Sequence, residues 1–366
     1  ASSGKLDVRQ LEPLRSIHGR FTVPGDKSIS HRALLFAAVA EGESLISGIA
    51  PGADVRTTRR LVEGLGVTVR DEGGQIVVAG RGWEGLDRVS AEHEVSLDCG
   101  NSGTTARLSL GLLAGRRGRF VLLGDASLSR RPMGRVVRPL AGLHARVEGG
   151  ETLPLVVVGG PLQAAQLRTG VASAQAKSAL ILAALQAEGE STVREPAPTR
   201  DHTERMLRAM GAPLEPFEDG SGWRVRGGSS PLSPVTIAVP GDPSSAAYAL
   251  ALACVLPESE IAVDGVSLNP TRLGFYRLLR RMGAELHCEE VSPASVRDEP
   301  EPRGRIVARS SSMRPIGLTE DDVTDAIDEV PLLAAMATQA HGVSVIRGAG
   351  ELRRKESDRI SATASL

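Results

Sequence analysis

The segment SISHRALLFAAVAEGESLISG, residues 28–48, decides the fold of this chain. It starts with small and hydroxyl side chains, continues as an apolar run of alanine and leucine, and ends in a short apolar stretch after Glu-Gly-Glu. The first part is typical of a buried helix and the last of a strand. The same order recurs in SGTTARLSLGLLAGRRGRFVLLG (102–124), SAQAKSALILAALQAEGESTVRE (173–195), SSAAYALALACVLPESEIAVDG (244–265) and DEVPLLAAMATQAHGVSVIRG (328–348).

The repeating unit is about 70–85 residues long, measured between the starts of successive copies. Between the apolar helices lie amphipathic ones, in which apolar residues at helical spacing alternate with arginine before a Gly or Ala. Short β-branched runs typical of strands follow most of them. The amphipathic segments are residues 53–70, 131–147, 200–215 and 269–286. Each unit therefore predicts strand, apolar helix, strand, amphipathic helix and strand, which is an α/β chain.

The tetrapeptide Val-Pro-Gly-Asp occurs twice, at residues 23–26 and 239–242, each time just before a serine-rich helix start. Pro-Gly pairs end the preceding strands. We place the crossings between two similar domains at these points. Residues 24–239 then form the first domain, with three units, and residues 1–23 pair with 240–366 in the second. The segment from about 289 to 309, rich in Pro, Glu and Arg, is expected to be a surface excursion.

Composition narrows the class of protein. A chain of 366 residues has room for two domains, and 43 Lys+Arg against 44 Asp+Glu give no reason to expect nucleic acid or a membrane surface as a partner. No apolar run approaches the roughly 18–20 residues of a membrane span, and the first residues contain no hydrophobic signal region. Cys99, Cys254 and Cys288 are widely spaced, without a CxxC pair, which argues against disulfides and zinc and fits a reducing cytoplasm.

The starts of the apolar helices are the candidate functional positions. Residues 25–28, 100–104 and 173–175 place small or hydroxyl residues where free backbone N–H groups and the helix dipole favour anions. Each alone is equally explained as an ordinary N-cap. Several together, accompanied by cations, indicate a cleft that gathers phosphates or carboxylates. The candidate cations are Lys27, Arg32, Arg107, Arg130, Arg131, Arg200, Lys355 and Arg359.

Two acidic stretches complete the candidate set. Asp325, Asp328 and Glu329 precede Pro331 and either compensate a helix dipole or serve as general acid, general base or hydroxyl acceptor. The run Lys-Glu-Ser-Asp-Arg at 355–359 is either a solvated helix face or part of the same site.

Other motifs are absent or incomplete. GDKS at 25–28 lacks the glycine spacing of a Walker loop, and Ser173 and Lys177 are four apart, which is not Ser-x-x-Lys. His31, His202 and His341 have no metal-ligand spacing. Arginine replaces lysine almost everywhere, so the few lysines that remain are worth inspecting. They are Lys5, Lys27, Lys177 and Lys355.

Several ordered motifs, spread from about residue 11 to the last residue, resemble the 5-enolpyruvylshikimate-3-phosphate (EPSP) synthase family. They are PGDKSISHRALLFAA (24–38), LDCGNSGTTARL (97–108), GDASLSRRPMGRVVRPL (124–140), GVASAQAKSALILAAL (170–185), TRDHTERML (199–207), VPGDPSSAAY (239–248), AIDEVPLLA (326–334) and ELRRKESDRI (351–360).

The resemblance implies transfer of the enolpyruvyl group of phosphoenolpyruvate to the 5-hydroxyl of shikimate 3-phosphate, by addition and elimination with release of phosphate. It implies no metal and no organic cofactor. The expected partners are these two small molecules, without nucleic acid or membrane, and a cytoplasmic monomer is expected. The implied fold is two similar domains of repeated βαβαββ units, an inside-out α/β barrel, with helix N-termini converging on a closing cleft.

The resemblance also assigns residues. Phosphoenolpyruvate would contact Lys27, Gly103, Arg131 and Arg359. The catalytic groups would be Lys27, Asp328 as acceptor of the hydroxyl proton, and Glu356 as the acid that shuttles a proton at the methylene carbon. Shikimate 3-phosphate would be bound by Lys27, Ser28, Arg32, Ser173, Gln175, Arg200, Asp328 and Lys355.

Some features depart from the family pattern. Glu351 stands where many members have Asn, and Gly103 stands where the best-known glyphosate-insensitive members have Ala. The related enolpyruvyl transferases of cell-wall synthesis use a loop cysteine, and none of the cysteines falls near the Arg131 segment. A second domain like the first would hold a sixth unit, so we expect the chain to lack its last unit. The alternative function is therefore a substrate-binding chain that is catalytically incomplete.

Overall fold

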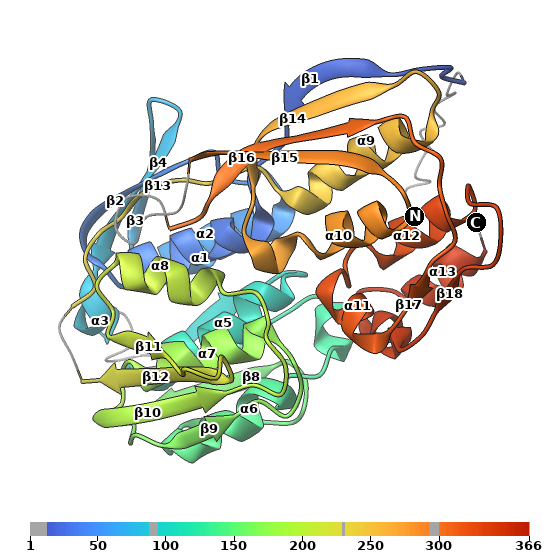
Figure 1. The fold of residues 1–366 in the computed structure, drawn as a ribbon. Helices are drawn as coiled ribbons and strands as arrows, with labels where there is room; N and C mark the ends of the chain where they lie inside the picture. Colours follow the sequence, from blue (N-terminus) through green and yellow to red (C-terminus); the bar gives the residue numbers. More distant parts are fainter. Residues whose placement is uncertain (1–12, 88–93, 229–230, 293–299, 366) are drawn as a thin grey trace, which may run out of the picture.

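The computed structural model describes residues 13–87, 94–228, 231–292 and 300–365 (Figure 1). These residues form four sheets of four strands and one of two strands. In each larger sheet one edge strand runs parallel to its neighbour, and the remaining pairs are antiparallel. The predicted α/β class and its repetition are therefore confirmed.

The first three units occupy residues 27–238. The first contains α1 (Lys27–Ala38), β2 (Glu41–Ser47), α2 (Ala53–Gly64), β3 (Thr68–Glu72), β4 (Gln75–Arg81), α3 (Gly82–Gly85) and β13 (Thr236–Ala238). The second contains β5 (Val95–Asp98), α5 (Gly103–Ala114), β6 (Gly118–Leu123), α6 (Gly134–Leu140), β7 (Arg146–Gly149) and β8 (Leu155–Gly159). The third contains β9 (Gln166–Arg168), α7 (Ala174–Ala184), β10 (Gly189–Arg194), α8 (His202–Ala209), β11 (Leu214–Pro216) and β12 (Gly222–Gly227).

Two further units follow. The fourth contains β1 (His18–Thr22), α9 (Pro243–Val255), β14 (Glu260–Ser267), α10 (Gly274–Arg281), β15 (Glu285–Ser292) and β16 (Arg303–Arg309). The fifth contains β17 (Gly317–Leu318), α11 (Glu320–Asp325), α12 (Val330–Ala337), β18 (Val345–Ile346) and α13 (Arg359–Ala364). In Figure 1 the sheet β1–β14–β16–β15 lies along the top of the view, and β9, β10, β11 and β12 lie along the bottom.

The amphipathic helices end in the same way in four units. Gly66, Gly211 and Gly283 each follow the helix C-cap of α2, α8 and α10 with φ of 76°, 84° and 94°. Glycine adopts this left-handed conformation without a Cβ penalty, so it ends the helix and turns the chain toward the next strand. After α6 the same position is taken by His144, with φ of 64°.

The apolar helices are packed tightly. A Cβ on Gly111 of α5 would lie 1.9 Å from the carbonyl oxygen of Ala179 on α7, so the two backbones touch where only glycine fits. The buried apolar residues form two separate clusters, one from residues 29–239 and one from residues 246–352.

The two Val-Pro-Gly-Asp segments lie against each other. Gly25 and Gly241 form an antiparallel bridge. The N–H of Asp26 donates to the carbonyl of Pro240 (2.8 Å), and the N–H of Asp242 donates to that of Pro24 (2.9 Å). The chain therefore crosses from one cluster to the other twice at a single point. Near it, β1 pairs in parallel with β14, while β13 pairs in parallel with β2.

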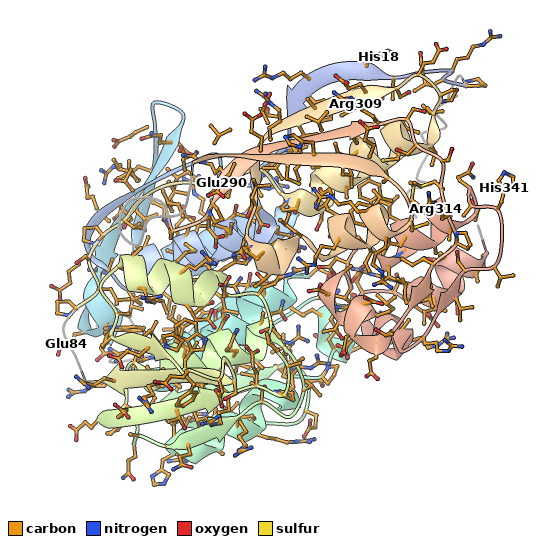
Figure 2. The ribbon with its side chains drawn as sticks, viewed as in Figure 1. His18, Glu84, Glu290, Arg309, Arg314 and His341 are labelled. Atoms are coloured by element: carbon orange, nitrogen blue, oxygen red, sulfur yellow. The ribbon has the colours of Figure 1, made fainter. Side chains whose placement is uncertain are left out.

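The surface excursion expected between residues 289 and 309 is wrong for most of its length. β15 extends to Ser292, and β16 (Arg303–Arg309) is an inner strand between β14 and β15. Gly304, Ile306 and Ala308 are buried and alternate with the less buried Arg303, Arg305 and Val307, and Arg309 lies on the surface (Figure 2). Abundant Arg and Pro concealed this period-two alternation, which is the stronger signal. Residues 293–299 lie outside the described part.

Candidate active site

Polar contacts hold the N-terminal turns of α1, α5 and α7 side by side. Gln175 in the first turn of α7 donates from Nε2 to Oγ1 of Thr104 in the first turn of α5 (2.9 Å). Arg32 of α1 donates from Nη2 to Oγ of Ser178 on α7 (2.9 Å). The positive ends of the three helix dipoles therefore lie together, an arrangement that favours bound anions.

The starts of α9 and α12 join this group. Asp242 is the N-cap of α9, and Arg272 lies between Asp242 (2.8 Å) and Asp26 (3.2 Å), the N-cap of α1. The hydroxyl of Ser244 in the first turn of α9 donates to Glu329, the N-cap of α12. The apolar helices of both clusters thus present their N-terminal ends to one region.

Lys27 is the first residue of α1. Asp26 caps the helix by accepting from the N–H of Ile29 (3.0 Å), and this cap fixes where Lys27 lies. The Lys27 ammonium is more than half exposed and pairs with Asp54 in the first turn of α2 (3.1 Å). It is an accessible cation at a helix N-terminus, which suits a contact with a phosphate.

Arg32 and Ser28 differ in accessibility. Arg32 is 2% exposed, and its guanidinium donates to Thr203, to Ser178 and to the carbonyl of Ser28. Burial lowers the pKa of Arg32 to about 10, although Glu204 favours its charge. Ser28 is half-buried in the first turn. In this conformation Arg32 supports the helix starts from within the fold, whereas Ser28 lies nearer solvent.

The start of α5 gathers arginines around Gly103. A Cβ on Gly103 would lie 2.7 Å from Nη1 of Arg107 and 3.6 Å from Nη1 of Arg131. Burial, together with the neighbouring Arg135 and Arg131, lowers the pKa of Arg107 to about 10. Arg131 is held by Asn101, both through its side chain and through its carbonyl (3.5 Å). Repelling cations at a helix N-terminus are typical of an anion site.

Ser173 and Gln175 lie at the start of α7, next to the start of α5. Ser173 caps α7 by accepting from the N–H of Ala176 (3.3 Å). Gln175 accepts from Nη1 of Arg107 (2.8 Å) through Oε1. The amide of Gln175 thereby links the start of α7 to Arg107, which lies beside Gly103 at the start of α5.

Asp328 lies among cations from both clusters. Its Oδ2 is 2.7 Å from Nη2 of Arg200, and its Oδ1 is 3.5 Å from Nη1 of Arg359. Burial alone would raise the pKa of Asp328, but Arg200 and Lys355 hold it well below its usual range. The carboxylate is therefore ionised at neutral pH and acts as an acceptor.

Lys355, Glu356 and Arg359 converge beside Asp328. Burial lowers the pKa of Lys355, and Asp328 partly offsets that effect. Glu356 pairs with Nη2 of Arg359 (2.7 Å). Burial would raise the pKa of Glu356, but hydrogen bonds from its own backbone N–H and from Arg359 lower it, and Arg131 adds to this effect. Arg131 therefore lies near enough to Glu356 for its charge to act on this carboxylate.

The sequence did not single out Arg135. Its Nη1 lies 2.9 Å from Oε1 of Glu351, so this ion pair connects α6 with the segment before Lys355. Glu351, expected only as a departure from the family pattern, thus has a partner within the chain. The spacing of Arg131 and Arg135 gives no helical signal, because Arg131 has an extended backbone and lies before the start of α6.

His31, His202 and His341 lie apart from one another, each in different surroundings. Nδ1 of His31 bonds to the hydroxyl of Thr58 (2.6 Å), and burial lowers the pKa of His31 to about 3. His202 is buried against Glu301 (2.6 Å), and His341 lies at the outer edge of the molecule (Figure 2). Among the described residues, no group of three or more His, Cys, Asp or Glu is placed to hold a metal ion. Within the same ranges, no helix is long and apolar enough to cross a membrane.

Comparison with known proteins agrees over nearly the whole chain. Residues 11–365 match the family described as EPSP synthase (3-phosphoshikimate 1-carboxyvinyltransferase). A protein of Limosilactobacillus fermentum named 3-phosphoshikimate 1-carboxyvinyltransferase is 48% identical over 96% of this chain and 80% of its own length. A protein of the same name from Thermus thermophilus is 47% identical over 98% of this chain and 82% of its own length.

Solved structures show the same likeness. EPSP synthase from Acinetobacter baumannii matches with a TM-score of 0.81 at 39% identity, covering 96% of this chain and 78% of that one. The enolpyruvyl transferase NikO from Streptomyces tendae matches with a TM-score of 0.68 at 16% identity, which shows a shared fold. With a family match over most of its residues and relatives at nearly half identity, this chain belongs to the EPSP synthase family.

Proposed function

We propose that this chain transfers the enolpyruvyl group of phosphoenolpyruvate to the 5-hydroxyl of shikimate 3-phosphate and releases phosphate. One observation carries the proposal: the half-buried guanidinium groups of Arg200 and Arg359 meet an ionised carboxylate, Asp328, where the apolar helices begin. Two anionic substrates repel each other in water. A site that offers helix dipoles and cations to both offsets this repulsion, and the effect grows as water is excluded.

In the addition step, the 5-hydroxyl oxygen bonds to C2 of phosphoenolpyruvate while C3 takes up a proton. Asp328 receives the hydroxyl proton, because its carboxylate is ionised and its basicity rises when the substrates draw Arg200 and Arg359 away from it. Glu356 supplies the proton to C3. Arg131 and Arg359 hold phosphoenolpyruvate, and the exposed ammonium of Lys27 contacts both substrates.

In the elimination step, the C2–O bond to phosphate breaks and a proton leaves the new methyl group, which restores the double bond. Glu356 takes this proton back, so its carboxyl group ends the cycle in the same protonation state in which it began. The departing phosphate takes the proton that Asp328 received from the hydroxyl. The cations around Gly103 stabilise the departing phosphate. Shikimate 3-phosphate is held by Lys27, Ser28, Ser173, Gln175, Arg200 and Lys355, with Arg32 supporting them from beneath.

The proposal is tested by titrating each substrate alone and then assaying phosphate release from the mixture. We expect both substrates to bind and phosphate to appear in equal amount to the enolpyruvyl product. Binding of both without phosphate release would favour the alternative function, a chain that binds substrates and does not turn them over. If neither substrate binds, both the proposed transferase activity and the alternative substrate-binding function are wrong.

Replacing Gly103 with alanine is expected to weaken glyphosate inhibition more than it weakens phosphoenolpyruvate binding. The new methyl group would meet the tip of Arg107 at 2.7 Å, so this side-chain end must move to make room for it. We expect the glyphosate Ki to rise about tenfold or more and KM for phosphoenolpyruvate to rise less, because loss of one well-fitted contact is worth roughly 1–3 kcal/mol. Equal Ki values in wild type and Gly103→Ala would contradict this explanation.

We further propose a division into domains at residues 24–239 and residues 1–23 with 240–366, and a cytoplasmic monomer. The two separate hydrophobic clusters support the division. The free thiols of Cys99, Cys254 and Cys288 support a reducing compartment. Light scattering with size exclusion checks the oligomeric state.

A further inference from the structure

Lys177 is a lysine that the proposed reaction leaves unexplained. Lys27 and Lys355 lie at the site, and Lys5 lies outside the described residues. Lys177 is on α7 and is 1% exposed, which makes it one of the largest fully buried side chains described. Lysine is almost never fully buried without partners, because its ammonium loses its hydration. Its partners therefore show what it does.

The Lys177 ammonium joins three elements. Its Nζ is 2.8 Å from Oε1 of Glu195, which follows β10, and 2.9 Å from Oε1 of Glu204 in the first turn of α8. It also donates to the carbonyl of Thr199 (3.4 Å). Burial on its own would lower the pKa of Lys177, but Glu204 and Glu195 raise it, so the ammonium stays charged.

These contacts fix the chain on the near side of Arg200. The hydroxyl of Thr199 donates to Oε2 of Glu195 (2.5 Å), and the N–H of Thr199 donates to Oε1 of the same carboxylate (3.3 Å). Glu195 therefore ties down the residue directly before Arg200 while Lys177 holds Glu195 in place.

The far side of Arg200 is fixed as well. Asp201 accepts from Asn269 (2.7 Å) and from Arg205 (2.8 Å). Two positions later, the hydroxyl of Thr203 bonds to Ser178 (2.6 Å), the residue after Lys177. Two adjacent residues of α7 thus hold two adjacent residues of α8, one by charge and one by a hydroxyl pair.

We propose that Lys177 is a positioning residue for the binding of shikimate 3-phosphate, acting by holding residues 195–204 so that Arg200 meets the substrate phosphate and Asp328. This inference rests on the proposed function, in which Arg200 lies beside that phosphate. Lys177 itself touches no substrate. An arginine on a loop loses about tenfold or more in binding when its backbone is released, because small misplacements are costly in a charged site.

The decisive comparison uses Glu204→Gln and the double variant Lys177→Met/Glu204→Gln. Glu204→Gln leaves Lys177 paired with Glu195 and keeps an amide oxygen as its acceptor on α8. Residues 195–204 therefore stay anchored, and the Kd of shikimate 3-phosphate stays within about twofold of wild type. The double variant carries the same net charge as wild type, avoids two unpaired buried carboxylates and releases Glu195. We expect its Kd for shikimate 3-phosphate to rise about tenfold, while the Kd of phosphoenolpyruvate changes less than about twofold.

Controls separate positioning from stability. Arg116→Met removes another mostly buried cation, paired with Asp87 and Gln186, and should lower Tm without changing either Kd. Thr199→Val removes only the hydroxyl link to Glu195, and we expect a rise of about threefold in the Kd of shikimate 3-phosphate. If the double variant does not fold, Thr199→Val alone tests whether anchoring Thr199 positions Arg200.

Isothermal titration with each substrate gives the outcomes. A folded double variant that binds shikimate 3-phosphate as Glu204→Gln does would overturn the role of Lys177, and so would a Thr199→Val variant with the wild-type Kd. If wild type itself fails to bind shikimate 3-phosphate, the proposed function falls and this inference falls with it. If wild type binds and the variants match it, only the positioning role is lost.

Discussion

Replacing Lys27 with methionine is expected to lower kcat/KM by about 10²–10³-fold, the usual cost of removing one positioned donor from a charged transition state. Methionine keeps the length of the aliphatic stem and the helix start that Asp26 caps. The lost ion pair with Asp54 is more than half exposed at its lysine end, so it contributes little to stability. Steady-state kinetics and Tm together check the prediction.

Two variants serve as controls for Lys27→Met. Lys27→Arg restores the charge and should recover part of the activity, because a guanidinium cannot place a compact charge between two substrates. Asp54→Asn removes the partner of Lys27 and should leave kcat/KM within about threefold of wild type. Turnover by Lys27→Met within about tenfold of wild type would show that the ammonium is not at the reacting centre.

Replacing Glu356 with glutamine is expected to lower kcat by about 10²–10⁴-fold, the range for a lost general acid. The isosteric amide keeps a hydrogen-bond acceptor for Arg359 and loses the proton that C3 must receive. Single-turnover rates with both substrates measure the chemical step. A kcat within about fivefold of wild type would assign the proton to another group.

The same carboxyl predicts a pH dependence of phosphoenolpyruvate binding. In the free protein the pKa of Glu356 is lowered, with Arg359 as the main charged cause, so Glu356 is ionised at neutral pH. When Arg359 turns to the anionic substrate, this support weakens and the pKa rises. The bound state then holds more protons, so binding strengthens as pH falls. Calorimetry in buffers of different ionisation enthalpy should detect proton uptake in wild type and not in Glu356→Gln.

Much of the fold was open to prediction because local signals agree with one another. The segment at 28–48 contains a cap, an apolar helix and a strand in order, and β2 and α1 appear where that pattern placed them. The inner strand β16 was missed because arginine and proline nearby suggested a loop, while its buried positions are small or branched residues spaced by two. The prediction of a loop gave more weight to the abundance of Arg and Pro than to the alternation of buried residues every second position.

The candidate site was predictable in its residue types and less so in its geometry. Helix starts and cations are visible along the chain, and the structure brings them together. Which cation reaches solvent is not visible, because it depends on neighbours far apart in sequence. Arg32 is enclosed by Thr203 and Ser178, whereas Lys27 is open. Arg135 and Lys177 acquire their roles through partners 216 and 18 residues away.

The doubled crossing of the chain has a consequence for biosynthesis. β1 is made early, yet its neighbour β14 lies 242 residues later, from His18 to Glu260. At roughly 5–20 residues per second, the ribosome needs about 10–50 s to supply that partner. Meanwhile the residues of α1 to β13 have emerged, and β13 closes the sheet of β2 before β14 exists. β1 is thus made before β14 and pairs with it late. In the meantime the hydrophobic cluster of residues 29–239 can assemble without β1.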